Sequence, residues 1–243
     1  MRVLSLVHQD DAPPGTFGEV VAEHGHEHDV RSFVPGAGDA PSGDYDAVMI
    51  FGGSMQVDQD DQHPWLEAER ELVRDLIDRG VPTLGVCLGS QLIAQTAGAQ
   101  VGPAVVPEVG WHPVELTVEA ADDPVMRACP HHFAAYQGHS YGFTLPPGAT
   151  PLAHGQADAL QAYRIGDSIW GLQFHPEVTW DIVDPWIAEH AADGDIEDEP
   201  ALREETRANL PRWTGFGRAL CARFLERAAL QAATLSAAAG SDQ

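Results

Sequence analysis

The sequence predicts an α/β protein with an open, mostly parallel sheet, and three observations predict this class. Short apolar runs typical of strands alternate with longer segments of helical periodicity, which is the order of elements in a parallel α/β sheet. Glycine-containing turns follow two of the apolar runs, at residues 52–53 and 85–89. Residues 100–153 instead contain shorter strand-like runs separated by Pro and Gly, which predicts an antiparallel extension of the same sheet.

The N-terminal part supplies two strands and a helix. Residues 4–7 and 48–51 are apolar runs that we expect to be strands. A helix is expected over residues 64–77, because proline suits its first turn and Gly80 ends the pattern. The apolar face of this helix consists of Leu66, Val73, Leu76 and Ile77.

The next strand and helix are joined at a cysteine. Residues 81–86 predict a buried strand and residues 90–97 a helix closed by Gly98, with Cys87 at the turn. Glycines two positions before and two after Cys87 permit the sharp bend of a nucleophile elbow. The helix directs free N–H groups at the sulfur and favours the thiolate. A lone cysteine after a strand is usually a small core residue, but this context indicates a nucleophile.

A base for such a nucleophile is available near residue 175. Residues 169–177 form a strand-like run that ends in His-Pro-Glu. Since side chains alternate along an extended chain, His175 and Glu177 are expected on one side, with Pro176 stiffening the spacer. The carboxylate can then orient the imidazole, as acyl transfer by a cysteine requires.

The length of 243 residues permits one or two domains, and we expect a single domain over residues 1–235. Its C-terminal part, residues 181–235, is expected to be a helical extension, with an acidic helix-prone stretch at 181–209 and a closing amphipathic helix at 212–233. Residues 236–243 are predicted to be a disordered tail.

Cysteine usage and hydropathy predict a cytoplasmic protein. Cys87, Cys129 and Cys221 are scattered, which argues against a disulfide framework and for a reducing compartment. The apolar run at residues 1–7 is too short for a signal peptide. No stretch approaches the ~20 apolar residues that span a bilayer, so no membrane partner is expected.

The charge balance excludes nucleic acid as an expected partner. Against 13 Lys+Arg stand 37 Asp+Glu, a formal net charge of −24, and phosphate backbones would be repelled. No metal site is expected either. His24, His26 and His28 alternate as ligands on a strand would, but the interleaved Glu23 and Glu27 favour a solvated helix end.

Three further sets of side chains are given structural roles. His131 and His132 are expected in a loop, and His139 in a structural hydrogen bond. Trp111, Trp170 and Trp180 are expected to pack in the interior rather than to bind a ligand.

Together these motifs resemble the class I glutamine amidotransferases of the triad type, which carry G-x-C-x-G-x-Q and a late H-P-E. The resemblance covers roughly residues 1–180 and is closest to the stand-alone, GMP-synthase-like branch. Further segments that carry it are Phe51-Gly52-Gly53-Ser54-Met55, Glu108-Val109-Gly110-Trp111, His139-Ser140-Tyr141 and Gln161-Ala162-Tyr163-Arg164.

The resemblance implies a flavodoxin-like sheet with helices on both faces, and release of ammonia from glutamine through a thioester, without a cofactor or metal. The catalytic residues it implies are Cys87, His175 and Glu177. It places the oxyanion hole at the N–H groups of Gly53 and Leu88, and glutamine contacts at Gln91, Ser140 and Tyr141.

Two functions remain open from the sequence. The protein could be a glutaminase that passes ammonia to a separate synthetase or ligase. Alternatively, it could be a free-standing hydrolase or transferase of γ-glutamyl amides or peptides with the same triad. A binding module with an idle cysteine would need a broken triad, whereas all three residues are present here. The first two functions share one site and are not separated by sequence.

Overall fold

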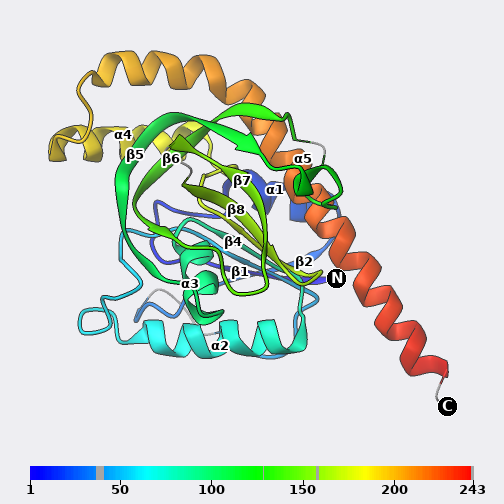
Figure 1. Ribbon diagram of the computed structural model, residues 1–243. Helices are drawn as coiled ribbons and strands as arrows, with labels where there is room; N and C mark the ends of the chain where they lie inside the picture. The colour runs from blue at the N-terminus through cyan, green and yellow to red at the C-terminus, as the bar shows by residue number, and fades with distance from the viewer. Residues whose placement is uncertain (37–40, 128, 157–158, 242–243) are drawn as a thin grey trace.

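The computed structural model describes residues 1–36, 41–127, 129–156 and 159–241. A nine-stranded mixed sheet runs through these residues in the order β2-β1-β3-β4-β9-β8-β7-β5-β6 (Figure 1). Its parallel half contains β1 (Arg2–Leu6), β2 (Glu27–Arg31), β3 (Ala47–Ile50), β4 (Thr83–Val86) and β9 (Ile169–Leu172). Its antiparallel half contains β5 (Val101–Leu116), β6 (His132–Phe143), β7 (Thr150–His154) and β8 (Leu160–Ile165). The predicted parallel sheet with an antiparallel extension is therefore confirmed.

The parallel half has the strand order of a flavodoxin-like fold, with β9 in the place of the fifth strand. Every residue of β3, β4 and β9 is buried, as expected for parallel strands covered on both faces. The carboxyl ends of these strands meet at one edge of the sheet. In folds of this kind ligands bind outside that edge.

Helices cover both faces of the sheet. α1 (Gly15–Glu23), α4 (Trp180–Asp193) and α5 (Glu199–Ser241) lie on one side, and α2 (Trp65–Arg79) and α3 (Leu88–Thr96) on the other (Figure 1). A short 3-10 helix, Glu119–Ala121, precedes the loop to β6. Alternating residues of β1 serve the two cores, because Val3 packs with Phe17 of α1 while Leu4 packs with Val73 of α2.

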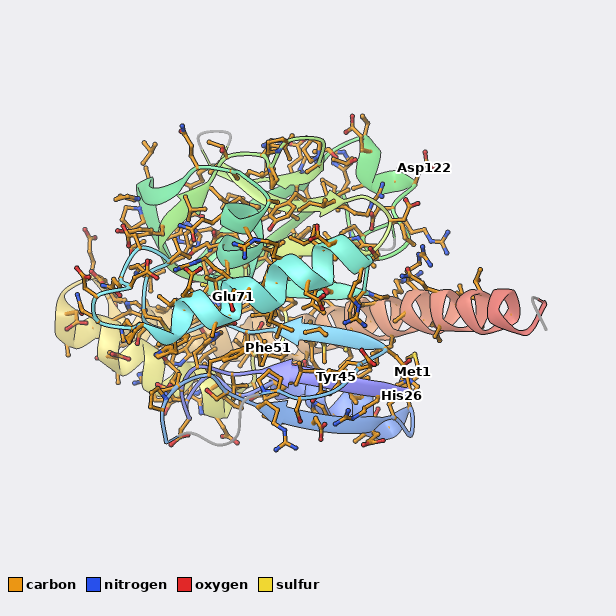
Figure 2. The ribbon with its side chains drawn as sticks, turned by 90° about the horizontal axis from the view of Figure 1, so that it is seen from below. Met1, His26, Tyr45, Phe51, Glu71 and Asp122 are labelled. Atoms are coloured by element: carbon orange, nitrogen blue, oxygen red, sulfur yellow. The ribbon has the colours of Figure 1, made fainter. Side chains whose placement is uncertain are left out.

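Helix α2 confirms the prediction made for it. Pro64 is its N-cap, and Gly80 ends it with a left-handed φ of 63°, a conformation that glycine adopts without steric cost. Figure 2 shows α2 against one face of the sheet, with Glu71 labelled on it. Glu69 is fully buried on the same helix.

The C-terminal region differs from its predicted division. The chain forms α4, and then α5 runs for 43 residues through Pro211, where the sequence had suggested a boundary between separate stretches. Leu210 and Trp213 are buried on either side of Pro211, so packing holds together a helix that proline alone would break. α5 also includes residues 236–241 of the predicted disordered tail, and residues 242–243 lie outside the described residues. The end of α5 projects beyond the sheet (Figure 1).

None of the described helices combines the length and the apolar character that crossing a membrane requires.

Candidate active site

One cavity of about 520 Å³ lies at the carboxyl edge of the parallel strands. Cys87, following β4, and His175, beyond β9, line it. The same cavity is lined by the other residues that the sequence assigned to oxyanion and substrate contacts, namely Gly53, Leu88, Gln91, Ser140 and Tyr141. Glu177 is buried and contacts His175. Residues up to 124 positions apart in the sequence, from Gly53 to Glu177, are thus brought together.

Cys87 is the only non-glycine residue with a positive φ in the described part of the chain, at φ 51° and ψ −111°. This conformation is rare for an L-residue and marks a strained turn between β4 and α3. The flanking glycines are required by close packing as well as by the bend. A Cβ on Gly85 would lie 2.6 Å from Ile93 Cδ1, and one on Gly89 would lie 2.1 Å from the Ile50 carbonyl oxygen. The turn therefore fits tightly against β3 and α3.

His175 and Glu177 form a buried pair, with His175 Nδ1 2.8 Å from Glu177 Oε1. The predicted contact is present, but the predicted geometry is wrong, because β9 ends at Leu172 and the pair lies in the bend that follows. Backbone contacts hold the bend in place of strand pairing. The His175 N–H donates to the Tyr136 carbonyl at 3.0 Å, and Trp213 Nε1 donates to the His175 carbonyl at 2.8 Å.

Cys87 and His175 flank the same glycine. A Cβ on Gly52 would lie 3.1 Å from His175 Cε1 and 3.6 Å from Cys87 Cβ. Burial alone would lower the pKa of His175, but the Glu177 carboxylate and the Cys87 sulfur outweigh burial and raise that pKa to about 10. The site thus favours a protonated imidazole at neutral pH.

The glycine turn after β3 is held by a buried ion pair that the sequence reasoning missed. His8 Nδ1 lies 3.0 Å from the Gly52 carbonyl oxygen, and His8 Nε2 lies 3.0 Å from both carboxylate oxygens of Glu69. Because both partners only accept hydrogen bonds, both ring nitrogens donate and the ring is charged. Burial would lower the pKa of His8, but Glu69 reverses the shift and the pKa is raised.

Two signals in the sequence could have indicated this pair. His8 follows the first strand at the edge where Cys87 was expected, and Glu69 interrupts the apolar face formed by Leu66 and Val73. The pair packs against the second glycine of the turn as well. A Cβ on Gly53 would lie 2.9 Å from His8 Cβ and 3.2 Å from Leu88 Cδ2. His8 is therefore packed beside both backbone positions expected to form the oxyanion hole.

The expected substrate residues form one wall of the cavity from α3 and β6. Gln91 Nε2 donates to the Tyr141 carbonyl at 3.1 Å and to Gln173 Oε1 at 3.3 Å. The Tyr141 hydroxyl donates to Asp58 at 3.2 Å. Ser140 Oγ accepts from Gln56 Nε2 at 3.5 Å. The wall is thus bound to the loop after β3.

A buried polar network joins the remaining motifs next to the cavity. Glu108 accepts from Gln161 Nε2 at 2.8 Å and faces His139 Nε2 at 3.3 Å, and Gln161 accepts from Gln137 at 2.9 Å. Burial would raise the pKa of Glu108, but His139 outweighs burial and the pKa is lowered. His139 therefore makes the expected structural contact. It also lines the cavity, and its Nδ1 has no partner among the described residues.

The other histidines flagged in the sequence lie outside the cavity or on its rim. Helix α1 ends at Glu23 and His24 bonds the Val20 carbonyl there, whereas His28 lies on β2 with Nε2 2.8 Å from Ser5 Oγ. The solvated helix end thus describes His24 but not His28. An exposed group elsewhere has metal-ligating atoms within 4.8 Å of one another, and consists of Glu115, His131 and His132.

The other two cysteines lack the surroundings of Cys87. Burial raises the pKa of the Cys129 thiol to about 12, and burial likewise raises the pKa of Cys221, which packs against α1 with Sγ 3.8 Å from the Phe17 carbonyl oxygen. Trp111 and Trp170 pack against aromatic rings as expected, whereas the Arg207 guanidinium lies 4.2 Å over the Trp180 ring.

Comparisons with known proteins bear on this geometry. The family model for glutamine amidotransferase class-I matches residues 23–190. The chain is 32% identical over 157 residues to the smaller of these relatives, a subunit of the glutamine-hydrolyzing GMP synthase of Ignicoccus hospitalis, covering 63% of this chain and 77% of the relative. It is 40% identical over 132 residues to a GMP synthase of Thermomicrobium roseum, covering 54% of this chain but only 23% of the relative.

Two other similarities extend the comparison. A γ-glutamyl-L-1-hydroxyisopropylamide hydrolase of a Pseudomonas species is 29% identical over 150 residues, covering 58% of this chain and 50% of the relative. The crystal structure of a glutamine amidotransferase from Thermotoga maritima matches with a TM-score of 0.83 and 27% identity, covering 93% of this chain and 98% of that one. The chain belongs to the class I glutamine amidotransferase family, in its GMP-synthase-like branch.

Proposed function

We propose that the protein hydrolyses the side-chain amide of glutamine through a thioester on Cys87, and passes the ammonia to a separate synthetase or ligase. The observation that carries this proposal is the cavity itself. A cysteine on a strained turn and a buried His-Glu pair line or flank one cavity, on either side of the same glycine. A nucleophile, a base and a group that orients the base are the parts that acyl transfer needs.

In the first half of the proposed reaction, the Cys87 thiol gives its proton to His175 and the sulfur attacks the amide carbon. The carbon–nitrogen bond breaks as His175 returns the proton to the departing nitrogen. In the second half, His175 removes a proton from water, which cleaves the thioester and releases glutamate and the free thiol. Glu177 holds the imidazole by its Nδ1, so that Nε2 carries out both proton transfers.

The tetrahedral oxyanion is assigned to the backbone N–H groups of Gly53 and Leu88. Leu88 begins α3, where the first N–H groups have no acceptor within the helix. Gly53 lies against the Leu88 side chain. One donor of this kind contributes about 3 kcal/mol to the transition state in comparable sites.

The test is turnover of glutamine by the purified protein and by cysteine variants. Cys87→Ser is expected to lower turnover by at least about a thousandfold, while Cys129→Ser and Cys221→Ser retain it. A glutamine-mimicking diazo-ketone is expected to add its mass at Cys87 alone. Activity that survives in Cys87→Ser but is lost in either other variant would rule out the proposed nucleophile.

A second function is favoured by the length of the cavity. Beyond His175 the cavity continues to Trp186, Glu189 and Asp193 on α4, which leaves room for an amine larger than ammonia. The protein would then cleave γ-glutamyl amides by the same reaction, as the name of the Pseudomonas relative indicates for that protein. Turnover of glutamine that rises when a synthetase is added supports the first function. Rapid cleavage of a substituted amide without any partner supports the second.

A further inference from the structure

We propose that the part of the cavity beyond His175 selects γ-glutamyl amides whose departing amine carries a second, positively charged amino group. This inference rests on the proposed Cys87 chemistry and adds the substrate class. His175 protonates the departing nitrogen, so the group attached to that nitrogen must lie on the far side of His175. The residues there decide which amine is accepted.

One face of α4 forms that side of the cavity. Trp186, Glu189 and Asp193 all line it, at helical spacings of three and four residues. The Trp186 ring packs edge-on to His175 with ring centroids 5.1 Å apart. From His175 outward the face therefore leads from an aromatic ring to two carboxylates near the C-terminal end of α4, which carries the negative pole of the helix dipole.

The charges along this path have one sign. Glu189, Asp193 and Asp195 line the cavity, and none of the described lining residues is an arginine, while the chain has no lysine. The two other histidines on this side face carboxylates of their own. His190 Nδ1 lies 3.0 Å from Asp195, and His112 Nδ1 lies 3.7 Å from Glu108. An ammonium group would be attracted here and a carboxylate repelled.

Two observations independent of the carboxylates also point to an amine. Trp186 offers an aromatic surface, on which cations bind favourably, and its Nε1 donates to the Asp11 carbonyl at 3.1 Å, which fixes the ring. In addition, the His139 side chain is 5% exposed and its Nδ1 lacks a partner among the described residues. With Nε2 donating to Glu108, Nδ1 is an acceptor for an N–H group in the cavity.

The reaction balances as a hydrolysis. The Cys87 sulfur bonds to the γ-glutamyl carbonyl carbon, the carbon–nitrogen bond breaks, and the diamine leaves with the proton from His175. Water then cleaves the carbon–sulfur bond, so one γ-glutamyl diamide and one water give glutamate and a diamine. The terminal ammonium keeps its charge throughout and contributes binding only.

Three substrates of similar length and different charge test the inference. They are γ-glutamyl-1,4-diaminobutane (cationic), γ-glutamyl butylamide (neutral) and γ-glutamyl-4-aminobutanoate (anionic). At low ionic strength kcat/KM is expected to fall about tenfold from the cationic to the neutral substrate and about tenfold again to the anionic one. The double variant Glu189→Gln, Asp193→Asn is expected to reduce the first ratio to about twofold.

A matched control is Glu204→Gln, Glu205→Gln, which removes two exposed carboxylates from α5 that do not line the cavity. This variant is expected to keep the wild-type ratios. Wild-type ratios within twofold, a preference for the anion, or cleavage of glutamine alone would each overturn the inference while the proposed function stands. Failure to cleave any amide, glutamine included, together with no diazo-ketone label on Cys87, would instead overturn the proposed function and the inference with it.

Discussion

The most consequential unexpected contact is between His8 and the carbonyl of Gly52. The Gly52 carbonyl and the Gly53 N–H belong to one planar peptide unit, and in a trans peptide they point in opposite directions. By holding the carbonyl at 3.0 Å, the charged imidazole fixes the direction of the N–H that we assign to the oxyanion. Burying His8 with Glu69 has a desolvation cost, and orienting this peptide is a function that accounts for it.

Glu69→Gln is therefore expected to reduce kcat for glutamine about tenfold or more with KM within about threefold, because an oxyanion donor acts in the transition state. Steady-state kinetics measure this split. Glu71→Gln, on the exposed side of the same helix α2, is the control and should leave both constants unchanged. An equal rise in KM with constant kcat would place the pair in substrate binding instead.

The pairing of His175 with Glu177 was predictable because both residues lie in one short motif. The pairing of His8 with Glu69 was not, since it joins residues 61 positions apart on a strand end and a helix. The same limit applies to the network of Glu108, His139 and Gln161. Its members were singled out by sequence, but their mutual contacts depend on how the antiparallel strands align. Motifs therefore identified the reacting groups, and tertiary packing supplied the groups that hold them.

Among the elements, α5 contributes more to the site than its position after all the strands suggests. Trp213 donates to the His175 carbonyl, and a Cβ on Gly217 would lie 1.8 Å from the Pro176 carbonyl oxygen. The helix thus lies directly against the His-Pro-Glu segment. The sequence predicted a closing helix here, but its continuity through Pro211 depends on buried side chains on both sides of the proline, which local propensity does not reveal.

Trp213→Phe is expected to keep most of the aromatic packing and to lose one hydrogen bond to the bend that holds His175. We expect a loss of about 1 kcal/mol in unfolding free energy and a several-fold lower kcat. Urea unfolding and glutamine turnover measure the two effects. The control is Trp180→Phe, whose ring stacks with Arg207 at the other end of α4 and which should leave kcat unchanged.

For the molecule as a whole, the two buried histidines determine how stability changes with pH. The folded state raises the pKa of both His8 and His175, the latter to about 10, above the usual value of about 6.5. A raised histidine pKa contributes stability that is complete below pH ~6.5 and is lost as the pH rises towards the folded pKa. Self-repulsion among the 37 acidic residues adds to the destabilisation at high pH.

The unfolding free energy is accordingly expected to decline between about pH 6.5 and about pH 10, by an amount on the order of a few kcal/mol. Urea titrations at successive pH values give the slope. In His175→Ala the decline should be smaller, because one of the two titrating groups is gone. A free energy that rises over this range would contradict the assignment of charge to these imidazoles.

The contact between Trp213 and His175 also bears on when the protein becomes active. The strands that carry His8, the glycine turn and Cys87 are synthesised first, and they can begin to assemble while the chain is still growing. The bend with His175 is held only after α5, which follows every strand of the sheet along the chain, has packed against it. The nucleophile is therefore made long before its base is secured, and a chain that stops short of α5 would carry a cysteine without a working partner. This helix thus acts in time as well as in space, by delaying the reaction until the ribosome has passed it.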